Sequence, residues 1–201
     1  MISTVIARFF NSLSPKSIQR SFGSWVRDHP EGWLNIIGAV IGLLTAIGAI
    51  AFSYSLSHLE HYTEHLQGLL QGDGTWLWFM PMIPMVGALF TGVVVYKFAR
   101  EAGGHGVPQV LDAMIRKGGK IPARIGVVKV LSAISTVGTG GSAGAEGPIV
   151  QIGAVVGSTL AQKLRIERRH VNTLLGCGAA AGISSIFNAP IAGVFFALEI
   201  L

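Results

Sequence analysis

Two uncharged apolar stretches, Leu34–Leu56 and Trp76–Tyr96, limit what this chain can fold into more than any other feature of it. A helix needs about 20 apolar residues to cross a bilayer, and both stretches reach that length. Only 12% of the residues are charged, whereas soluble domains carry roughly 25%. Because a spanning helix satisfies all of its own backbone polar groups, the sequence predicts an all-helical membrane protein.

The distribution of Lys and Arg predicts how the chain is oriented in the membrane. They gather in Arg8–Arg27, Lys97–Arg124 and Lys163–Arg169, whereas the connection Ser57–Thr75 has none. The positive-inside rule then predicts a cytoplasmic N-terminus, cytoplasmic basic regions and an external Ser57–Thr75. The net charge of +5 is therefore interpreted as a topology signal and not as a nucleic-acid footprint.

The same pattern divides the chain into two parts. Residues 1–33 are predicted to be a cytoplasmic or interfacial amphipathic segment, with an organellar transit peptide as the alternative. Residues 34–201 are predicted to be the membrane domain, in a plasma membrane or a bacterial inner membrane. Pro81 and Pro84 are expected to distort the second span near its start.

Beyond Arg124 the apolar pieces become shorter. Ile125–Val137 and Pro148–Leu160 are each too short to cross alone, and a glycine-rich break separates them. Because both flanking basic regions are predicted to be cytoplasmic, these pieces should form a re-entrant pair that meets inside the membrane, as in many transporter ion sites. Helices are predicted over Val171–Ile186 and Ala189–Leu201, the second still apolar where the sequence stops. Three glycine pairs four residues apart predict close helix packing: Gly38/Gly42, Gly153/Gly157 and Gly178/Gly182.

Glu146 lies inside the break, between glycines and a proline, at the start of the next apolar helix. A helix start offers unpaired N–H groups and a positive dipole end, which together form a natural anion site. A carboxylate there can occupy the site or, once protonated, leave it. An ionisable group within a membrane is by default functional, so the sequence predicts an anion gate. The alternative is an ordinary helix-start acid that interacts with the dipole.

Three ordered motifs resemble those of the CLC family of chloride channels and chloride/proton exchangers. They are Gly144-Ala145-Glu146-Gly147-Pro148, Gly104-His105-Gly106-Val107-Pro108, and Gly178-Ala179-Ala180-Ala181-Gly182 leading to Asn188-Ala189-Pro190. The resemblance covers most of the chain and implies a helical bundle with re-entrant half-helices, the first of two inverted repeats. It also implies chloride as the transported ion, a homodimer in the lipid bilayer, and no cofactor.

The resemblance also implies roles for individual residues. Glu146 matches the gating glutamate, and the backbone at Ala145 and Gly147 matches ligands of the outer anion site. The inner anion-coordinating loop, at another half-helix start, corresponds to Gly104, His105, Gly106, Val107 and Pro108. Lys129 matches an intramembrane lysine that makes the local potential positive, with snorkelling towards the inner interface as the alternative.

Three residues depart from the family pattern. His105 replaces the usual serine, and because it titrates near neutral pH it leaves anion selectivity open. Ala145 replaces the usual Arg or Lys. Ile200, directly after Glu199, stands where exchangers carry an internal proton-accepting glutamate. This departure favours a channel, or an exchanger with a non-standard proton path. The second half of the family's protomer has no match, so a non-conducting fragment or assembly module is a further alternative.

Other chemistry has little support in the sequence. The single cysteine, Cys177, allows no internal disulfide and no multi-cysteine metal site, and it is interpreted as a packing residue. His61 and His65 have a spacing that could hold a metal, but a wet outer helix explains the same pattern. The near-match Gly138-x-Gly140-x-x-Ala143 lacks the setting of a dinucleotide site. No nucleophile–base pair is visible, so the sequence predicts neither an enzyme nor a bound metal.

Overall fold

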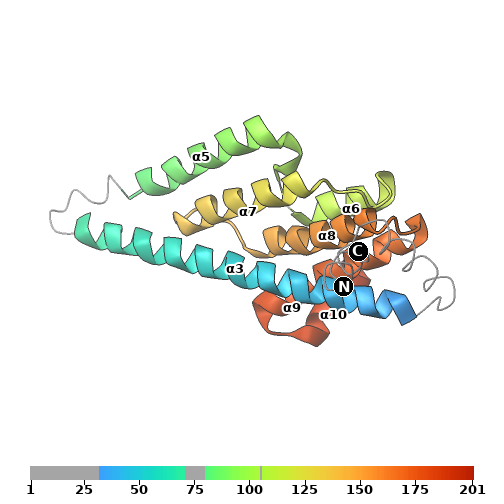
Figure 1. The fold of residues 1–201 in the computed structure, drawn as a ribbon. Helices are drawn as coiled ribbons and strands as arrows, with labels where there is room; N and C mark the ends of the chain where they lie inside the picture. The colour runs from blue at the N-terminus through green and yellow to red at the C-terminus, as the bar shows by residue number, and fades with distance from the viewer. Residues whose placement is uncertain (1–31, 71–79, 105) are drawn as a thin grey trace, which may run out of the picture. The chain divides into compact units, whose positions relative to one another are not determined.

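The computed structural model describes residues 32–70, 80–104 and 106–201, and every regular element within them is a helix, as predicted (Figure 1). The chain divides into two units, Met1–Ala39 and Val40–Leu201, which are described separately. The first unit is described only over Gly32–Ala39, the start of helix α3. The predicted amphipathic segment, residues 1–33, therefore lies almost entirely outside the described residues.

Helix α3 (Gly32–Leu70) is longer than the predicted span Leu34–Leu56 and continues through most of the predicted outer connection. Its end is stabilised by tertiary contacts, because the Leu59 side chain packs directly on Gly138 and the Thr63 hydroxyl donates to the Gly138 carbonyl at 2.9 Å. Over Gly32–Gly68 it is long and apolar enough to cross a membrane. It is the one helix of the described residues that meets both conditions.

Helix α5 (Met82–Phe98) begins directly after Pro81, which is its N-cap residue. Pro81 and Pro84 thus lie at the N-cap and in the first turn of α5, where the N–H that proline lacks would have no intrahelical acceptor. Large apolar side chains on α5 stay exposed, among them Leu89 at 63% and Val93 at 63%. Exposed apolar faces of this kind are typical of helices that contact lipid.

The basic region Lys97–Arg124 is not a simple loop. It contains the 3-10 helix η2 (Arg100–Ala102) and helix α6 (Gly106–Arg116). Helix α6 is amphipathic, and it packs against α8 and buries Val110 and Ala113. A helix start was predicted here within Gly104–Pro108, and the structure begins α6 at Gly106.

Four further helices follow within a few residues of their predicted bounds: α7 (Ala123–Gly138), α8 (Glu146–Lys163), α9 (Arg168–Phe187) and α10 (Pro190–Ile200). Helix α8 is buried over most of its length and contacts α6, α7 and α9. Its position in the packing explains why most of its residues are apolar or small.

Glycines allow the backbones of α8 and α9 to touch. A Cβ at Gly153 would collide with the Gly178 carbonyl, and one at Gly178 would collide with the Gly153 carbonyl. The predicted close packing at these two pairs is confirmed, because Gly157 meets the carbonyl of Leu174 and Gly182 that of Ile149. At Gly42, by contrast, a Cβ would meet nothing within 4 Å.

A left-handed residue turns the chain from α9 to α10. Asn188 has φ 50° and ends α9, a conformation that Asn tolerates better than most residues. Pro190 then opens α10, where its fixed φ suits the first helical turn. Gly193 lets α10 pack closely against α9, because a Cβ added at this residue would lie only 2.5 Å from the carbonyl oxygen of Ala180.

Candidate functional site: two helix starts and a buried lysine

The break between α7 and α8 is a short irregular segment, residues 139–145. Gly140, with φ 89°, donates its N–H to the Val137 carbonyl at 2.8 Å, and Gly141 donates to the Thr136 carbonyl at 2.8 Å. These bonds close the end of α7 and turn the chain towards α8. The predicted break therefore exists at the predicted place.

Helix α8 begins at Glu146 without a side-chain cap. The N-cap residue is Ala145, whose side chain cannot accept a hydrogen bond, and Pro148 has no N–H. The N–H groups of Glu146 and Gly147 belong to the first turn, where a helix offers no carbonyl four residues earlier. An anion is the natural partner for such a start.

The Glu146 side chain folds back towards the start of its own helix. It is exposed in this chain, and its Oε2 atom lies so close to Gly144 that a Cβ there would collide with it. Gly144 therefore leaves the space that the carboxylate occupies. The acid lies at the helix start, as the sequence predicted.

The start of α6 touches the start of α8. A Cβ at Gly106 would collide with the carbonyl oxygen of Gly147 and would lie 2.6 Å from its carbonyl carbon. Only a residue without a side chain fits at this crossing. Two motifs that lie 40 residues apart in the sequence thus bring two helix N-termini into backbone contact.

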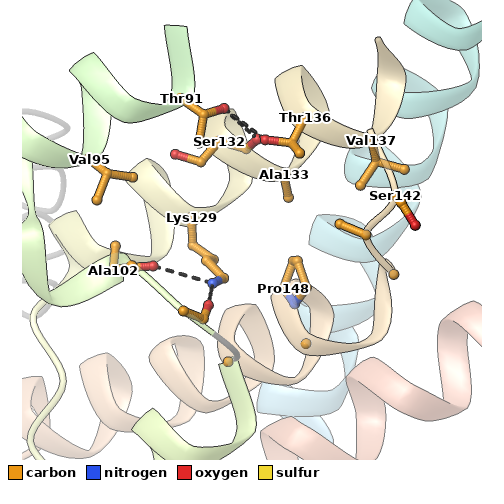
Figure 2. Close-up of a pocket in the computed structure, with 16 residues that line it drawn as sticks. Thr91, Val95, Ala102, Lys129, Ser132, Ala133, Thr136, Val137, Ser142 and Pro148 are labelled. Atoms are coloured by element: carbon orange, nitrogen blue, oxygen red, sulfur yellow. Dashed lines mark hydrogen bonds between the residues drawn. The ribbon is translucent and has the colours of Figure 1, made fainter. Parts of the chain in front are cut away.

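Lys129 lies beside this contact, on α7. The residue is 8% exposed, and its ammonium group donates to the carbonyls of Ala102, at 3.3 Å, and Gly104 (Figure 2). It forms no ion pair with an acidic side chain of the described residues. The ammonium group is therefore held by backbone carbonyls of residues 102–104, and both the electrostatic role and snorkelling towards the inner interface stay predictions.

These elements enclose a cavity of about 350 Å³ (Figure 2). Of the predicted site residues, the structure brings Gly104, Gly106, Lys129 and Gly147 to its wall. No acidic side chain lines the cavity within the described part of the chain. Buried positive charge and two helix N-termini favour an anion as its occupant, since the acid of those first turns, Glu146, lies outside the cavity wall.

Four hydroxyl side chains of the cavity wall were missed by the sequence reasoning: Thr91, Ser132, Thr136 and Ser142. The Thr91 hydroxyl donates to the Ser132 carbonyl at 3.1 Å and lies 2.9 Å from the Thr136 hydroxyl. The Ser132 hydroxyl is buried and has no hydrogen-bond partner among the described residues. Ser132 follows Lys129 by three residues, which places both on one helix face; this spacing was the available signal.

Other predicted site residues do not line this cavity. Ala145 is half-buried, and neither it nor Val107 lines the cavity. Pro108 lines a second cavity, of about 660 Å³. His105 lies outside the described residues. Whether these residues contact an anion stays a prediction.

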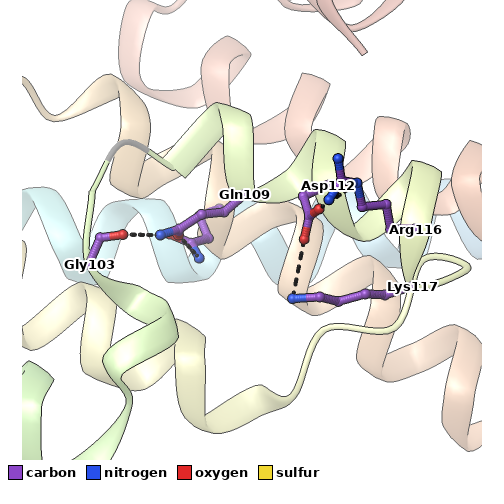
Figure 3. A network of polar contacts seen from close by, with 6 residues as sticks. Gly103, Gln109, Asp112, Arg116 and Lys117 are labelled. Carbon is purple, nitrogen blue, oxygen red and sulfur yellow. Dashed lines mark hydrogen bonds and ion pairs between the residues drawn. The ribbon is translucent and has the colours of Figure 1, made fainter.

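Two glutamine side chains connect the inner loop to α8. Gln151 donates to the Oε1 atom of Gln109 at 2.7 Å, and Gln109 donates to the Gly103 carbonyl (Figure 3). The carbonyls of residues 102–104 thus all accept hydrogen bonds, that of Gly103 from Gln109 and the other two from Lys129. The carbonyl dipoles of the inner loop are thus partly neutralised beside the α6 start.

These features define a class of protein: an all-helical chain with lipid-type apolar faces, an irregular break between two short helices, and a cavity at the break that is lined by Lys129 and hydroxyl side chains. Non-helical backbone at membrane depth is tolerated only where it is buried in protein or lines such a cavity. Comparison with known proteins gives the family. The model of the voltage gated chloride channel family matches residues 87–201, and the chain belongs to this family, the CLC proteins.

Individual relatives agree with the assignment. The chain is 34% identical over 170 residues to the H(+)/Cl(-) exchange transporter ClcA of Klebsiella pneumoniae (strain 342), which covers 82% of this chain and 35% of that protein. It is similar in structure to a slow cyanobacterial Cl-/H+ antiporter, with TM-score 0.70, 26% identity, and 80% of this chain and 38% of that chain covered. The chain is also similar in structure to a CLC-type fluoride/proton antiporter, with TM-score 0.67 and 29% identity. This match covers 83% of this chain and 39% of that chain. The chain thus spans about a third of the length of the curated relative.

Proposed function

We propose that this chain is the first half of a CLC-type anion transport unit that moves chloride across a membrane. The observation that carries the proposal is the cavity where the starts of α6 and α8 meet beside the buried ammonium group of Lys129. A dehydrated anion needs donors and positive potential inside the membrane, because its hydration is lost there. Backbone N–H groups at helix starts supply both without a counter-charge that binds the anion too tightly.

In this proposal Glu146 is the gate. Its carboxylate lies at the N-terminus of α8 and competes with an anion for the same positive end of the helix. Protonation removes the negative charge and with it the attraction to the helix start. The side chain then gives up the site, and an anion replaces it.

Proton-coupled exchange is the second candidate for the same site. The relatives named above are described as H(+)/Cl(-), Cl-/H+ and fluoride/proton exchangers, which favours exchange. Ile200 at the position of the internal glutamate favours a channel or an unusual proton path. Glu199, the adjacent acid on α10, is exposed in this chain.

The two candidates differ in one measurable quantity. Liposomes that contain the complete translated product are loaded with KCl, and chloride efflux and proton uptake are recorded together. A channel gives chloride efflux with no proton movement against a proton gradient, and an exchanger gives a fixed ratio of the two ions. Replacing chloride by fluoride or nitrate identifies the anion, and the absence of all anion flux would favour the assembly-module alternative.

We also propose that the protein works as a homodimer. Helix α10 leaves apolar side chains exposed on its surface, among them Ile191 at 74% and Leu198 at 77%. A second copy or lipid would cover them. Cross-linking in membranes, with the size of the product as readout, distinguishes the two.

A further inference from the structure

Two turns that are distant in sequence form a dense basic surface that the anion site does not use. We define this basic patch by six side chains: Lys117, Lys120 and Arg124 around the α6–α7 turn, and Arg165, Arg168 and Arg169 around the α8–α9 turn. All six are exposed. The positive-inside rule predicts one membrane side for both turns.

A buried hydroxyl joins the α6–α7 turn to helix α8. Ser158 on α8 is 0% exposed, accepts the N–H of Ile121 at 2.8 Å and donates to the Gly119 carbonyl at 2.6 Å. Gln162 adds a bond to the Ser158 hydroxyl at 2.9 Å. The basic patch is therefore held by the folded core and does not depend on two independent loops meeting by chance.

A second contact brings the cations of the two turns together. The Arg168 guanidinium group lies over Gly118, where an added Cβ would be 2.9 Å from its Nε atom. Gly118 has φ 59° and follows Lys117 directly. Arg168 thus lies directly over the turn that carries Lys117 and Lys120.

The charge of the basic patch is not balanced within the described residues. Asp112 is shared by Arg116, at 3.5 Å, and Lys117, at 3.3 Å (Figure 3). Glu167 pairs with Arg169 at 2.9 Å.

The remaining four cations, Lys120, Arg124, Arg165 and Arg168, form no ion pair with a described acid. Helices α7 and α9 both begin here, neither has an acid in its first turn, and the acid at the α9 N-cap, Glu167, is the one already paired with Arg169. Like charges beside positive helix ends repel one another, so an external anionic partner would stabilise this end of the molecule.

We propose that the basic patch binds the phosphate headgroups of anionic phospholipids in the adjacent leaflet. Clusters of four or more Lys and Arg at a membrane surface attract such lipids. A lipid fits better than a soluble phosphate because Ile115, directly before Arg116, is 78% exposed and offers an apolar side chain at the edge of the patch. The headgroup would contact the cations while the acyl chains stay beside the helices.

The test is lipid binding by the purified chain in a neutral detergent, followed by native mass spectrometry. The probes are short-chain phosphatidylglycerol, phosphatidylcholine of the same chain length, and inorganic phosphate. Phosphatidylglycerol is expected to bind, phosphatidylcholine to bind much more weakly, and added NaCl to weaken the anionic lipid's binding by screening. Competition by inorganic phosphate at the same concentration would assign the site to free phosphate and overturn the lipid proposal.

Variants locate the binding. The double variant Arg165→Gln/Arg168→Gln should weaken phosphatidylglycerol binding by roughly 25-fold, since each cation near a membrane surface contributes about a fivefold factor. Lys97→Gln/Arg100→Gln removes two exposed cations outside the basic patch and should weaken binding clearly less than the patch variant, because a headgroup bound at the patch does not contact them. Lys120→Gln/Arg124→Gln, on the other turn, repeats the test should the first double variant fail to fold. Equal losses in patch and control variants would refute the assignment.

Discussion

The contact between the two helix starts makes Gly106→Ala an informative perturbation. The added Cβ would lie 2.6 Å from the Gly147 carbonyl carbon and 3.2 Å from the Gln151 Cβ. Carbon atoms that are not bonded normally stay near 3.4 Å or more, so α6 and α8 must separate by roughly 1 Å to accept the methyl group. The change acts at the proposed anion site itself.

The energetic effect follows from this overlap. Overpacking of a close contact costs about 1–3 kcal/mol. The usual gain from replacing a helical glycine by alanine, up to about 1 kcal/mol in a helix interior, is small at the first residue of α6. Gly176→Ala is the matched control, because its Cβ meets nothing within 4 Å in the middle of α9 and should add up to about 1 kcal/mol of stability.

Two assays check the prediction. Denaturant unfolding in detergent should give a lower midpoint for Gly106→Ala and an equal or higher one for Gly176→Ala. Chloride flux should fall at least about fivefold in the first variant, as expected for a loss of 1 kcal/mol in anion stabilisation, and stay unchanged in the second. Wild-type stability and flux in Gly106→Ala would show that the two helix starts do not meet as described.

Three further changes probe the surroundings of the site. Lys129→Met removes the buried charge and leaves the carbonyl of Ala102 without this donor. The chloride concentration at half-maximal flux should therefore rise by about tenfold or more. An unchanged concentration would show that Lys129 does not belong to the site. Ser158→Ala should lower the free energy of unfolding by about 1–3 kcal/mol, because the Ile121 N–H loses its acceptor, and denaturant titration measures this. Gln151→Leu should cost about 1 kcal/mol through its lost bond to Gln109, and an unchanged unfolding midpoint would contradict that bond.

The helix bounds near the site could be predicted because strong local signals fix them. Gly140 and Gly141 interrupt an apolar pattern, and Pro148 and Pro190 can stand only in a first helical turn. The uncharged stretches predicted the membrane class for the same reason, since lipid tolerates few alternatives. These features depend on neighbouring residues in the sequence.

Features that depend on contacts between distant residues could not be predicted in this way. Helix α3 extends to Leu70 because Leu59 and Thr63 pack on Gly138, and nothing local in the sequence indicates that contact. Ser132 lines the cavity, yet serine in an apolar helix has many ordinary uses.

The meeting of the two helix starts was likewise not predictable from local signals. The motifs placed Gly106 and Gly147 at two separate helix starts, but their mutual contact is a property of the packing of α6 on α8.

The most direct measurement of the central claim compares chloride flux through reconstituted protein from pH 4 to pH 8 for wild type, Glu146→Gln and Glu64→Gln. The first variant removes the charge of the proposed gate while keeping its shape, and the second neutralises an exposed acid on α3. The account predicts that flux rises on acidification in wild type and in Glu64→Gln, and that it is high and independent of pH in Glu146→Gln. The same pH profile in all three proteins would contradict it.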